Sequence, residues 1–353
     1  MTGGRGPHHD TVAPPVTLGV DVGGTKVLGV ALDATATVVA EAKAPTPRLR
    51  PPSAPGPGAE GIIDTIVAVI ERLHSALDDA GVGAAAVSGI GVGVPGLIDA
   101  GRLRYAPNLP GGEGLEVRAR LVDRLDGAPI VVDNDATCAM IAEWLMGAAT
   151  GASDAVLVTL GTGIGGGLVV NGAVARGALG HAGEIGHMVV DPSGPSCPCG
   201  KRGCWERVAS GSGLGRLARE AAHAGRLDEV LRRAGGDPEA VRGEDVTAAA
   251  ARGDAGARGV LEELGWWLAL GLANLANILD PALFVLGGGL VDAVELVLEP
   301  VRQAFDDLVE DREGRPPEMI HLAALGERAG AVGAALLVRP GGVAGGVAGG
   351  PTG

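Results

Sequence analysis

The pattern that most constrains the fold of this chain is a strand, a glycine-rich turn and a second strand, which occurs twice. The first copy joins strands over 16–22 and 27–32 through a Gly-Gly-Thr-Lys turn. The second joins strands over 155–160 and 168–170 through a longer run of glycines that contains a threonine. Apolar runs joined by a glycine turn are typical of β-hairpins. Two such hairpins predict a duplicated architecture with one phosphate-contacting turn in each half.

The remainder of the chain alternates between helical and strand-like patterns. In 59–80, apolar residues recur at helical spacing, which predicts an amphipathic helix. Further strands are predicted at 37–43, 89–94, 129–132, 283–286 and near Ile320, and further helices at 117–125, 136–146, 214–279, 291–308 with a break at Pro300, and 329–338. The alternation of strands with helices predicts an α/β fold.

Length, charge and the two ends limit what the chain can be. With 353 residues it has room for about two domains that each bury a core. Its 28 basic and 42 acidic residues give a net charge of −14, which disfavours nucleic acid or an anionic membrane as a partner. The N-terminus lacks the apolar region of a signal peptide, and the charge-free stretch of 264–279 is shorter than a membrane span. We therefore expect a cytoplasmic protein whose residues 1–15 and Gly/Ala-rich 339–353 are disordered.

Three of the four cysteines lie together in a polar loop rich in proline and glycine. Cys197, Cys199 and Cys204 have the spacing C-x-C-x4-C, and His187 stands ten residues before the first thiol. Three sulfur ligands and one nitrogen suit tetrahedral Zn²⁺, and a site closed by four protein ligands is typical of a structural metal. Three reduced core cysteines are the alternative, and the polar loop favours zinc over it. A disulfide is disfavoured because it would leave one thiol over.

The glycine turns that follow strands are candidate phosphate sites. Because glycine has no Cβ, the main chain of such a turn can approach a phosphate closely. An isolated Gly-Gly hairpin is usually only a turn, but three turns that each follow a strand favour contact with a nucleotide. At the first turn, a carboxylate can also hold the water shell of a metal ion. The candidates are Asp21, Gly23, Gly24, Thr25 and Lys26 at the first turn, Gly161, Thr162 and Gly163 at the second, and Gly287, Gly288 and Gly289 at the third.

Polar side chains near these turns indicate chemistry on an alcohol. Asp135 follows a buried strand and begins a helix, which it has the alternative role of capping. In phosphoryl transfer to an alcohol, a carboxylate accepts the hydroxyl proton while metal-bound phosphate is held opposite it. Four further groups on glycine-rich loops suit hydrogen bonds to sugar hydroxyls, with a solvated loop position as the alternative: Asn108, Asn134, Glu184 and Glu206.

Five motifs occur along the chain in a fixed order. They are Asp21-Val-Gly-Gly-Thr-Lys26, Asn134-Asp135-Ala136, the glycine run of 160–167, Gly183-Glu184-Ile185-Gly186-His187, and the loop of 197–206 that carries the three thiols and Glu206. With this set, over roughly residues 16–338, the chain resembles the ROK family of sugar kinases and repressors, and most closely its bacterial glucokinases.

The resemblance implies an actin-like (ASKHA, ribonuclease H-like) two-domain sugar kinase fold with duplicated βββαβα halves. It implies a small α/β domain over 16–133, on which the C-terminal helix of 326–338 packs. A large α/β domain over 134–325 would carry the zinc loop of 187–204.

The resemblance also implies a role for each candidate residue. Asp135 is expected to be the general base that activates the 6-hydroxyl of a sugar. His187 is expected to bind zinc through one ring nitrogen while the other faces the sugar. The glycine turns would cradle ATP, and Mg²⁺ would bridge its phosphates. The implied sugar contacts are Asn108, Asn134, Asp135, Glu184, His187 and Glu206, and the implied zinc ligands are His187, Cys197, Cys199 and Cys204.

One position departs from the family pattern. Family glucokinases often have tryptophan after Asn-Leu-Pro-Gly near the sugar, whereas this chain has Gly112 there. This difference bears on apolar stacking at the rim of the pocket and so on the identity of the hexose.

Two functional classes occur in the family, sugar kinase and transcriptional repressor. The repressors carry a helix-turn-helix module ahead of the kinase-like body, whereas about fifteen residues precede the first strand here and the net charge is −14. We therefore expect ATP-dependent phosphorylation of glucose to glucose 6-phosphate. N-acetylglucosamine, N-acetylmannosamine or fructose is the alternative sugar, and polyphosphate the alternative donor. The family tends toward homodimers and homotetramers.

Overall fold

The computed structural model describes residues 15–47, 60–83, 86–106, 109, 112–125 and 127–339. Its framework is a pair of five-stranded sheets. The first has the order β3 (Val38–Pro45), β2 (Lys26–Leu32), β1 (Val16–Val22), β4 (Val87–Val94) and β7 (Ile130–Asn134). The second has the order β10 (Ala173–Val174), β9 (Ile164–Val170), β8 (Ala155–Leu160), β11 (Leu283–Gly287) and β12 (Ile320–Leu322).

The two sheets have the same strand directions. β2 pairs antiparallel with β1 and β3, whereas β4 pairs parallel with β1 and β7. In the second sheet, β9 pairs antiparallel with β8 and β10, and β11 pairs parallel with β8 and β12. Each half follows the expected βββαβα order and then adds a strand and a helix. The prediction of a duplicated α/β fold is therefore confirmed.

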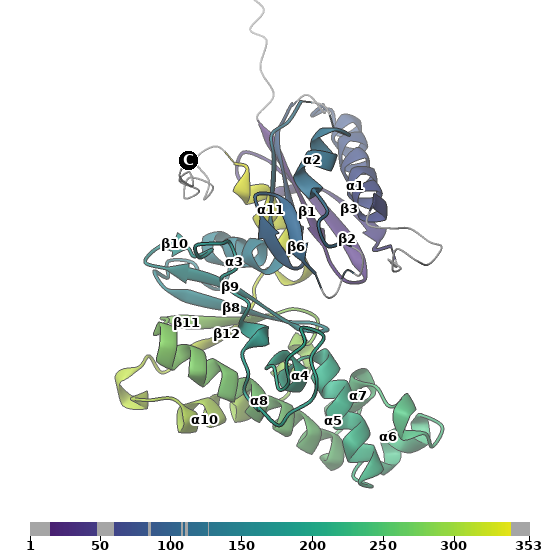
Figure 1. Cartoon of the computed structure of the whole chain (residues 1–353), viewed down its shortest axis with the longest axis vertical. Helices are drawn as coiled ribbons and strands as arrows, with labels where there is room; N and C mark the ends of the chain where they lie inside the picture. Colours follow the sequence, from purple (N-terminus) through teal and green to yellow (C-terminus); the bar gives the residue numbers. More distant parts are fainter. Residues whose placement is uncertain are drawn as a thin grey trace, which may run out of the picture.

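Helices cover both faces of each sheet (Figure 1). α1 (Glu60–Asp79) and α2 (Val117–Val122) pack on the outer face of the first sheet. Beyond the outer face of the second sheet lie α4 (Glu206–Ala209), α5 (Gly211–His223), α6 (Asp228–Arg233), α7 (Gly243–Ala251), α8 (Ala255–Leu279), α9 (Val291–Glu295) and α10 (Leu298–Leu308). Among them, α6 packs on α5 and α7. Strand alternation explains the separate cores, because Val156 and Val158 of β8 face these helices while Leu157 faces inward.

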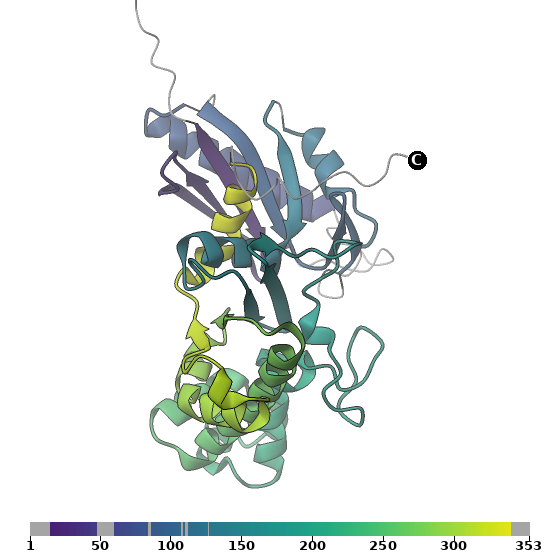
Figure 2. The same ribbon diagram turned by 90° about the vertical axis from the view of Figure 1, so that its left-hand side faces the viewer.

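Two helices lie between the sheets and cross from one half to the other. α3 (Asp135–Met146) follows β7 of the first sheet but packs on β8 and β9 of the second. α11 (Ala329–Leu337) follows β12 of the second sheet but packs on β1 and β4 of the first, and Figure 2 shows it in yellow between the halves. The packing is close, since a Cβ at Gly91 would lie 1.8 Å from the carbonyl oxygen of Ala334. A Cβ at Gly333 would lie 1.6 Å from that of Cys138, so both positions require glycine.

The break in the helical region of 291–308 lies before Pro300 and not at it. α9 ends at Glu295 and α10 begins at Leu298. Pro300 is therefore in the first turn of α10, where a backbone N–H has no acceptor within the helix and its loss costs nothing. The expectation of a break at Pro300 is wrong for this reason.

The second glycine turn is shorter than the sequence suggests. β9 begins at Ile164, so the glycines of 165–167 lie in the strand and the turn is confined to 161–163. These glycines permit α3 to pack on the strand, because a Cβ at Gly167 would lie 2.3 Å from the Cβ of Met140. A hairpin of β5 (Leu97–Asp99) and β6 (Arg102–Tyr105) was not predicted.

Some expectations fall on parts of the chain that the structure does not describe. Residues 1–14 and 340–353, nearly all of the two ends expected to be disordered, lie outside the described residues, as does Asn108. Within the described ranges, no helix has both the length and the apolar character to cross a bilayer.

Candidate active site

Asp135 is the first residue of α3 and follows β7 directly. The helix cap is its neighbour Asn134, whose Oδ1 accepts a hydrogen bond of 3.0 Å from the N–H of Thr137. The Nδ2 of Asn134 donates to the carbonyl oxygen of Gly96 at 3.1 Å, which fixes the amide orientation. Because Asn134 caps the helix, the capping role does not account for the carboxyl group of Asp135.

The surroundings of Asp135 adjust its acidity. Burial of the carboxyl group is the largest influence and raises the pKa of Asp135 to about 6. The N–H of Ala136, which donates to Oδ1 at 2.8 Å, lowers that pKa, and the charge of Glu184 raises it. A carboxylate that titrates near neutrality suits proton abstraction, because general-base catalysis is most efficient when the pKa lies near the working pH.

A second carboxyl group, that of Asp21, lies at the carboxyl end of β1. Burial is again the main influence; together with the charge of Asp135 it raises the pKa of Asp21 to about 8, while Lys26 opposes the rise. Both residues adjoin Gly93 of β4, where a Cβ would lie 3.5 Å from Oδ1 of Asp21 and 3.4 Å from the Cα of Asp135. Two neighbouring carboxyl groups on one sheet edge favour a divalent cation, which relieves their repulsion.

His187 and the three thiols form a compact cluster. Their ligand atoms all lie within 4.8 Å of one another. The Sγ atoms of Cys199 and Cys204 are 3.5 Å apart, and the Sγ of Cys197 is 3.8 Å from Nδ1 of His187. A tetrahedral ion with Zn–S bonds of about 2.3 Å needs sulfur–sulfur distances of about 3.8 Å. The donor set and its spacing therefore fit Zn²⁺.

The loop that carries the thiols folds back on itself through glycine and main-chain hydrogen bonds. The N–H of Cys197 donates to the carbonyl oxygen of Lys201 at 2.8 Å, and that of Gly200 donates back to Cys197 at 3.0 Å. Gly203 has a φ of +66°, and a Cβ there would lie 1.5 Å from the carbonyl oxygen of Asp191. The local sequence thus brings the thiols together without help from distant elements.

His187 stands between the cysteine cluster and two carboxylates. Its Nδ1 faces the thiols, and its Nε2 lies 3.8 Å from Oε2 of Glu184. Oε1 of Glu206 is 3.7 Å from Nδ1 of His187 and accepts a hydrogen bond of 3.1 Å from the Sγ of Cys197. Burial raises the pKa of Glu184, whereas the two histidines beside it lower that pKa. The three polar side chains therefore present donors and acceptors on one side of the cluster.

The second and third glycine turns lie side by side. The N–H of Leu290, just after the third turn, donates to the carbonyl oxygen of Leu160 at 2.9 Å. Ser210, which is buried, donates from its Oγ to the carbonyl oxygen of Thr162 at 2.9 Å. A Cβ at Gly163 would lie 2.4 Å from Oε2 of Glu206. The second turn is therefore in contact with one of the carboxylates of the cysteine loop.

The first glycine turn is arranged differently from the other two. Its hairpin closes through a hydrogen bond of 2.9 Å from the N–H of Gly23 to the carbonyl oxygen of Lys26. The Nζ of Lys26 forms an ion pair with Glu327, which lies just before α11. Among the turn residues, Lys26 is thus directed toward the C-terminal segment in this structure.

Gly112 lies in a restricted space. It is buried, and a Cβ there would lie 3.1 Å from the carbonyl oxygen of Leu109 and 3.2 Å from a methyl group of Leu103. In this loop conformation, a side chain at 112 would require Leu109 and Leu103 each to shift slightly.

The sequence profile of the ROK family matches residues 17–340. This chain belongs to the ROK family. It is 35% identical over 328 residues to the glucokinase of Streptomyces coelicolor, a match that covers 92% of this chain and 98% of the relative. It is also 35% identical over 329 residues to the glucokinase of Halalkalibacterium halodurans, with 91% and 94% covered.

A solved ROK structure is similar over nearly the whole length. It is a ROK family glucokinase from Streptomyces griseus in complex with glucose and AMPPNP, with 36% identity and a TM-score of 0.77. The match covers 91% of this chain and 98% of that chain. The resemblance to the ROK family that the motifs indicate is therefore confirmed, as is the actin-like fold expected from it.

Sequence reasoning missed one ion pair next to the candidate site residues. Both Nε and Nη2 of Arg176 lie 2.9 Å from Oδ2 of Asp133, and both side chains are largely buried. Asp133 precedes Asn134-Asp135, while Arg176 begins the segment that leads to Glu184. The pair thus ties the strand before the candidate base to the loop that carries a candidate sugar ligand. Asp133 directly precedes the Asn134-Asp135-Ala136 motif, but nothing in the sequence around Arg176 indicated the pairing.

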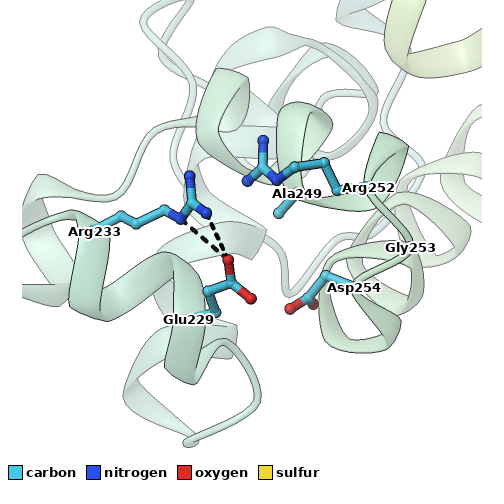
Figure 3. A pocket seen from close by; sticks show the side chains of 6 residues that line it. All are labelled: Glu229, Arg233, Ala249, Arg252, Gly253 and Asp254. Atoms are coloured by element: carbon cyan, nitrogen blue, oxygen red, sulfur yellow. Dashed lines mark hydrogen bonds and ion pairs between the residues drawn. The ribbon is translucent and has the colours of Figure 1, made fainter.

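A separate hollow lies between α6, the end of α7 and the start of α8 (Figure 3). It has a volume of about 370 Å³ and is lined by Glu229, Arg233, Ala249, Arg252, Gly253 and Asp254. Arg233 is paired there with Glu229 at 2.8 and 3.1 Å. The hollow is lined by none of the candidate site residues.

Proposed function

We propose that this ROK protein catalyses the ATP-dependent phosphorylation of glucose to glucose 6-phosphate. The observation that carries the proposal is the meeting of three sets of residues. Asp135 lies within electrostatic range of Glu184, Glu184 adjoins His187 and the cysteine cluster, and Glu206 contacts the second glycine turn. Support comes from the 35% identity to curated glucokinases and from the similarity to a glucokinase solved with glucose and AMPPNP.

The chemistry assigned to the chain is a single phosphoryl transfer. Asp135 accepts the proton of the sugar 6-hydroxyl group. The 6-oxygen of the sugar forms a bond to the γ-phosphorus of ATP, and the bond from that phosphorus to the oxygen of the leaving ADP breaks. Asn108, Asn134, Glu184, His187 and Glu206 hold the sugar hydroxyls, so that the 6-hydroxyl group is presented to Asp135. The backbone of the turns at 23–26, 161–163 and 287–289 receives the phosphates of ATP.

Two metal ions complete the proposal. Asp21 would hold Mg²⁺ with the nucleotide, where the cation neutralises charge on the phosphates. His187, Cys197, Cys199 and Cys204 would hold structural Zn²⁺, and their role is to fix the position of the loop between Glu184 and Glu206. Nδ1 of His187 serves the metal and Nε2 the sugar, which matches the direction of each nitrogen in the structure.

A coupled assay of ADP release tests the function. The purified chain is assayed with Mg-ATP and a panel of glucose, fructose, N-acetylglucosamine and N-acetylmannosamine, and the product with glucose is identified as glucose 6-phosphate. We expect the highest kcat/KM for glucose. A higher kcat/KM for an N-acetylated sugar or for fructose would transfer the proposal to that hexose. Replacing ATP with polyphosphate in the same assay tests the donor.

The remaining expectations from the sequence are predictions about the assembled protein. We predict a homodimer or homotetramer, a cytoplasmic location, and no affinity for DNA. Sedimentation velocity measures the first, and a gel-shift assay with DNA measures the last.

A further inference from the structure

The chain passes between its two halves twice, and the second passage is short. After β12, residues 323–328 lead back to α11 and the first sheet. The segment begins attached to the second sheet, because the N–H of Ala323 donates to the carbonyl oxygen of Leu286 at 2.8 Å. Whatever holds this segment also limits how the two halves move against each other.

The buried side chain of Glu143, on α3, accepts hydrogen bonds from the first part of this segment. Glu143 has an exposed fraction of 0%. Its Oε1 accepts a hydrogen bond of 2.8 Å from the N–H of Leu325, and its Oε2 accepts bonds of 3.1 Å from Ala324 and 2.9 Å from Ala148. Gly147 leaves room for this arrangement, since a Cβ there would lie 2.1 Å from Oε2. Three backbone donors around one buried carboxylate form a strong anchor, because hydrogen bonds to a charged group exceed those between neutral groups.

A second anchor holds the other end of the segment to the first sheet. Glu327 forms ion pairs with Lys26 of β2 and, at 2.7 Å, with Lys43 of β3. Gly326 lies between the two anchors with a φ of +55°, and no heavy atom beyond its two chain neighbours lies within 4 Å of the position of its missing Cβ. It is therefore the residue of this passage with both conformational freedom and open surroundings.

We propose that Glu143 is a positioning residue for the phosphoryl transfer, which confines the hinge of this passage to Gly326. This inference rests on the proposed function. α3 begins with Asp135, and Glu143 is two turns further along the same helix. α11 packs against the other carboxyl group of the site, since a Cβ at Gly330 would lie 2.5 Å from Cγ of Asp21. By tying the start of the passage to α3, Glu143 leaves only the residues after Leu325 free to change the orientation of α11, and so of Asp21, relative to Asp135.

The variant Glu143→Gln tests this role. Glutamine keeps one acceptor oxygen and replaces the other with an NH₂ group, which cannot accept from a backbone N–H, so at least one of the bonds is lost. We expect faster hydrogen exchange of the amides of Ala324 and Leu325, measured by mass spectrometry on the full chain. We also expect kcat to fall by about tenfold and KM for glucose to rise, because a small misplacement of reacting groups is costly and hinge variants change both constants.

Glu220→Gln is the matched control. Glu220 lies on the surface of α5 and pairs with Arg216 at 2.7 Å. It carries the same change of charge without touching the passage, so exchange in 323–328 and both kinetic constants should equal those of the parent.

Several results would overturn the proposal. Faster exchange of the Ala324 and Leu325 amides with unchanged kcat and KM would show that Glu143 has a structural role only. Unchanged exchange of these amides would show that Glu143 does not anchor the segment. If Glu143→Gln does not fold, Glu143→Asp, which keeps the charge but shortens the reach, takes its place. Failure of both variants to fold would contradict a local anchor. A parent chain with no activity on any hexose would instead refute the proposed function. The exchange data would in that case still test whether Glu143 anchors the segment of 323–328.

Discussion

At the residue scale, acidity decides what Asp135 and Asp21 can do. The pKa of Asp135 is raised to about 6, mainly by burial, so it is largely ionised at neutral pH and able to accept a proton. We predict that kcat/KM for glucose falls by about tenfold for each pH unit below about 6. The measurement is a pH–rate profile between pH 4.5 and pH 8, over which folding is monitored by circular dichroism. A flat profile across this range would argue against Asp135 as the base.

Substitution of the same residue separates its chemical role from its structural one. Asp135→Asn should retain glucose binding, because the amide occupies the same space and Asn134 still caps the helix. We predict a fall in kcat of about 10²–10⁴-fold, the usual contribution of a general base. Isothermal titration of glucose provides the control for binding. Turnover near that of the parent would show that another group takes the proton.

Asp21 provides a prediction about stability. Its pKa is raised from 3.8 to about 8, mainly by burial, so the unfolded chain releases this proton more readily than the folded one. A raised folded-state pKa contributes stability that is complete below pH 3.8 and is lost as the pH rises through about 8. Asp21→Asn removes that loss, and we predict an increase in Tm at pH 8.5 of roughly 2–4 °C without magnesium or nucleotide. The same variant should be inactive with Mg-ATP. A lower Tm at pH 8.5 would contradict the assigned burial.

At the element scale, the cysteine loop fixes the distance between two sugar ligands. Cys199→Ser removes one thiolate from a four-ligand cluster. We predict less than one zinc ion per chain, measured by inductively coupled plasma mass spectrometry. We also predict a rise in KM for glucose of about tenfold or more, because metal ligands orient the groups beside them. Cys138→Ser, at the buried cysteine outside the cluster, should keep the zinc. Metal-free Cys199→Ser with full activity would disconnect the metal from the sugar site.

The pairing of Arg176 with Asp133 is a second device at this scale. Lysine at 176 would keep the charge but not the two parallel N–H donors, so we predict a rise in KM for glucose of about fivefold for Arg176→Lys. Arg104→Lys is the matched control, since Arg104 also directs Nε and Nη2 at one carboxylate oxygen, that of exposed Asp99. An equal effect of both substitutions would show that the position of Arg176 has no special role.

At the scale of the whole molecule, local sequence patterns predicted the fold, whereas side-chain pairs between residues distant in the sequence were not predicted. The two hairpins and the helices were predictable because spacing of apolar residues and glycines is a local property. The C-x-C-x4-C loop folds on itself, so its cluster could be predicted as well. Arg176 lies 43 residues from Asp133, and Glu143 lies 182 residues from Leu325. No spacing rule connects such partners, since they meet only after α3 and α11 have crossed between the halves and brought the two sheets together. The glycines of 165–167 were assigned to a turn for the same reason. They lie in β9 because α3 packs closely on them, and α3 is distant from them in the sequence.

A crystal structure of the chain with glucose and a non-hydrolysable ATP analogue tests the proposal for the whole molecule. We predict the 6-hydroxyl oxygen of glucose within about 2.6–3.2 Å of the carboxylate of Asp135, in line with the γ-phosphorus. The other hydroxyl groups should contact Glu184, His187 and Glu206, and the phosphates should lie against the glycine turns. Glucose bound elsewhere, or bound with its 6-hydroxyl group directed away from Asp135, would contradict the proposed site.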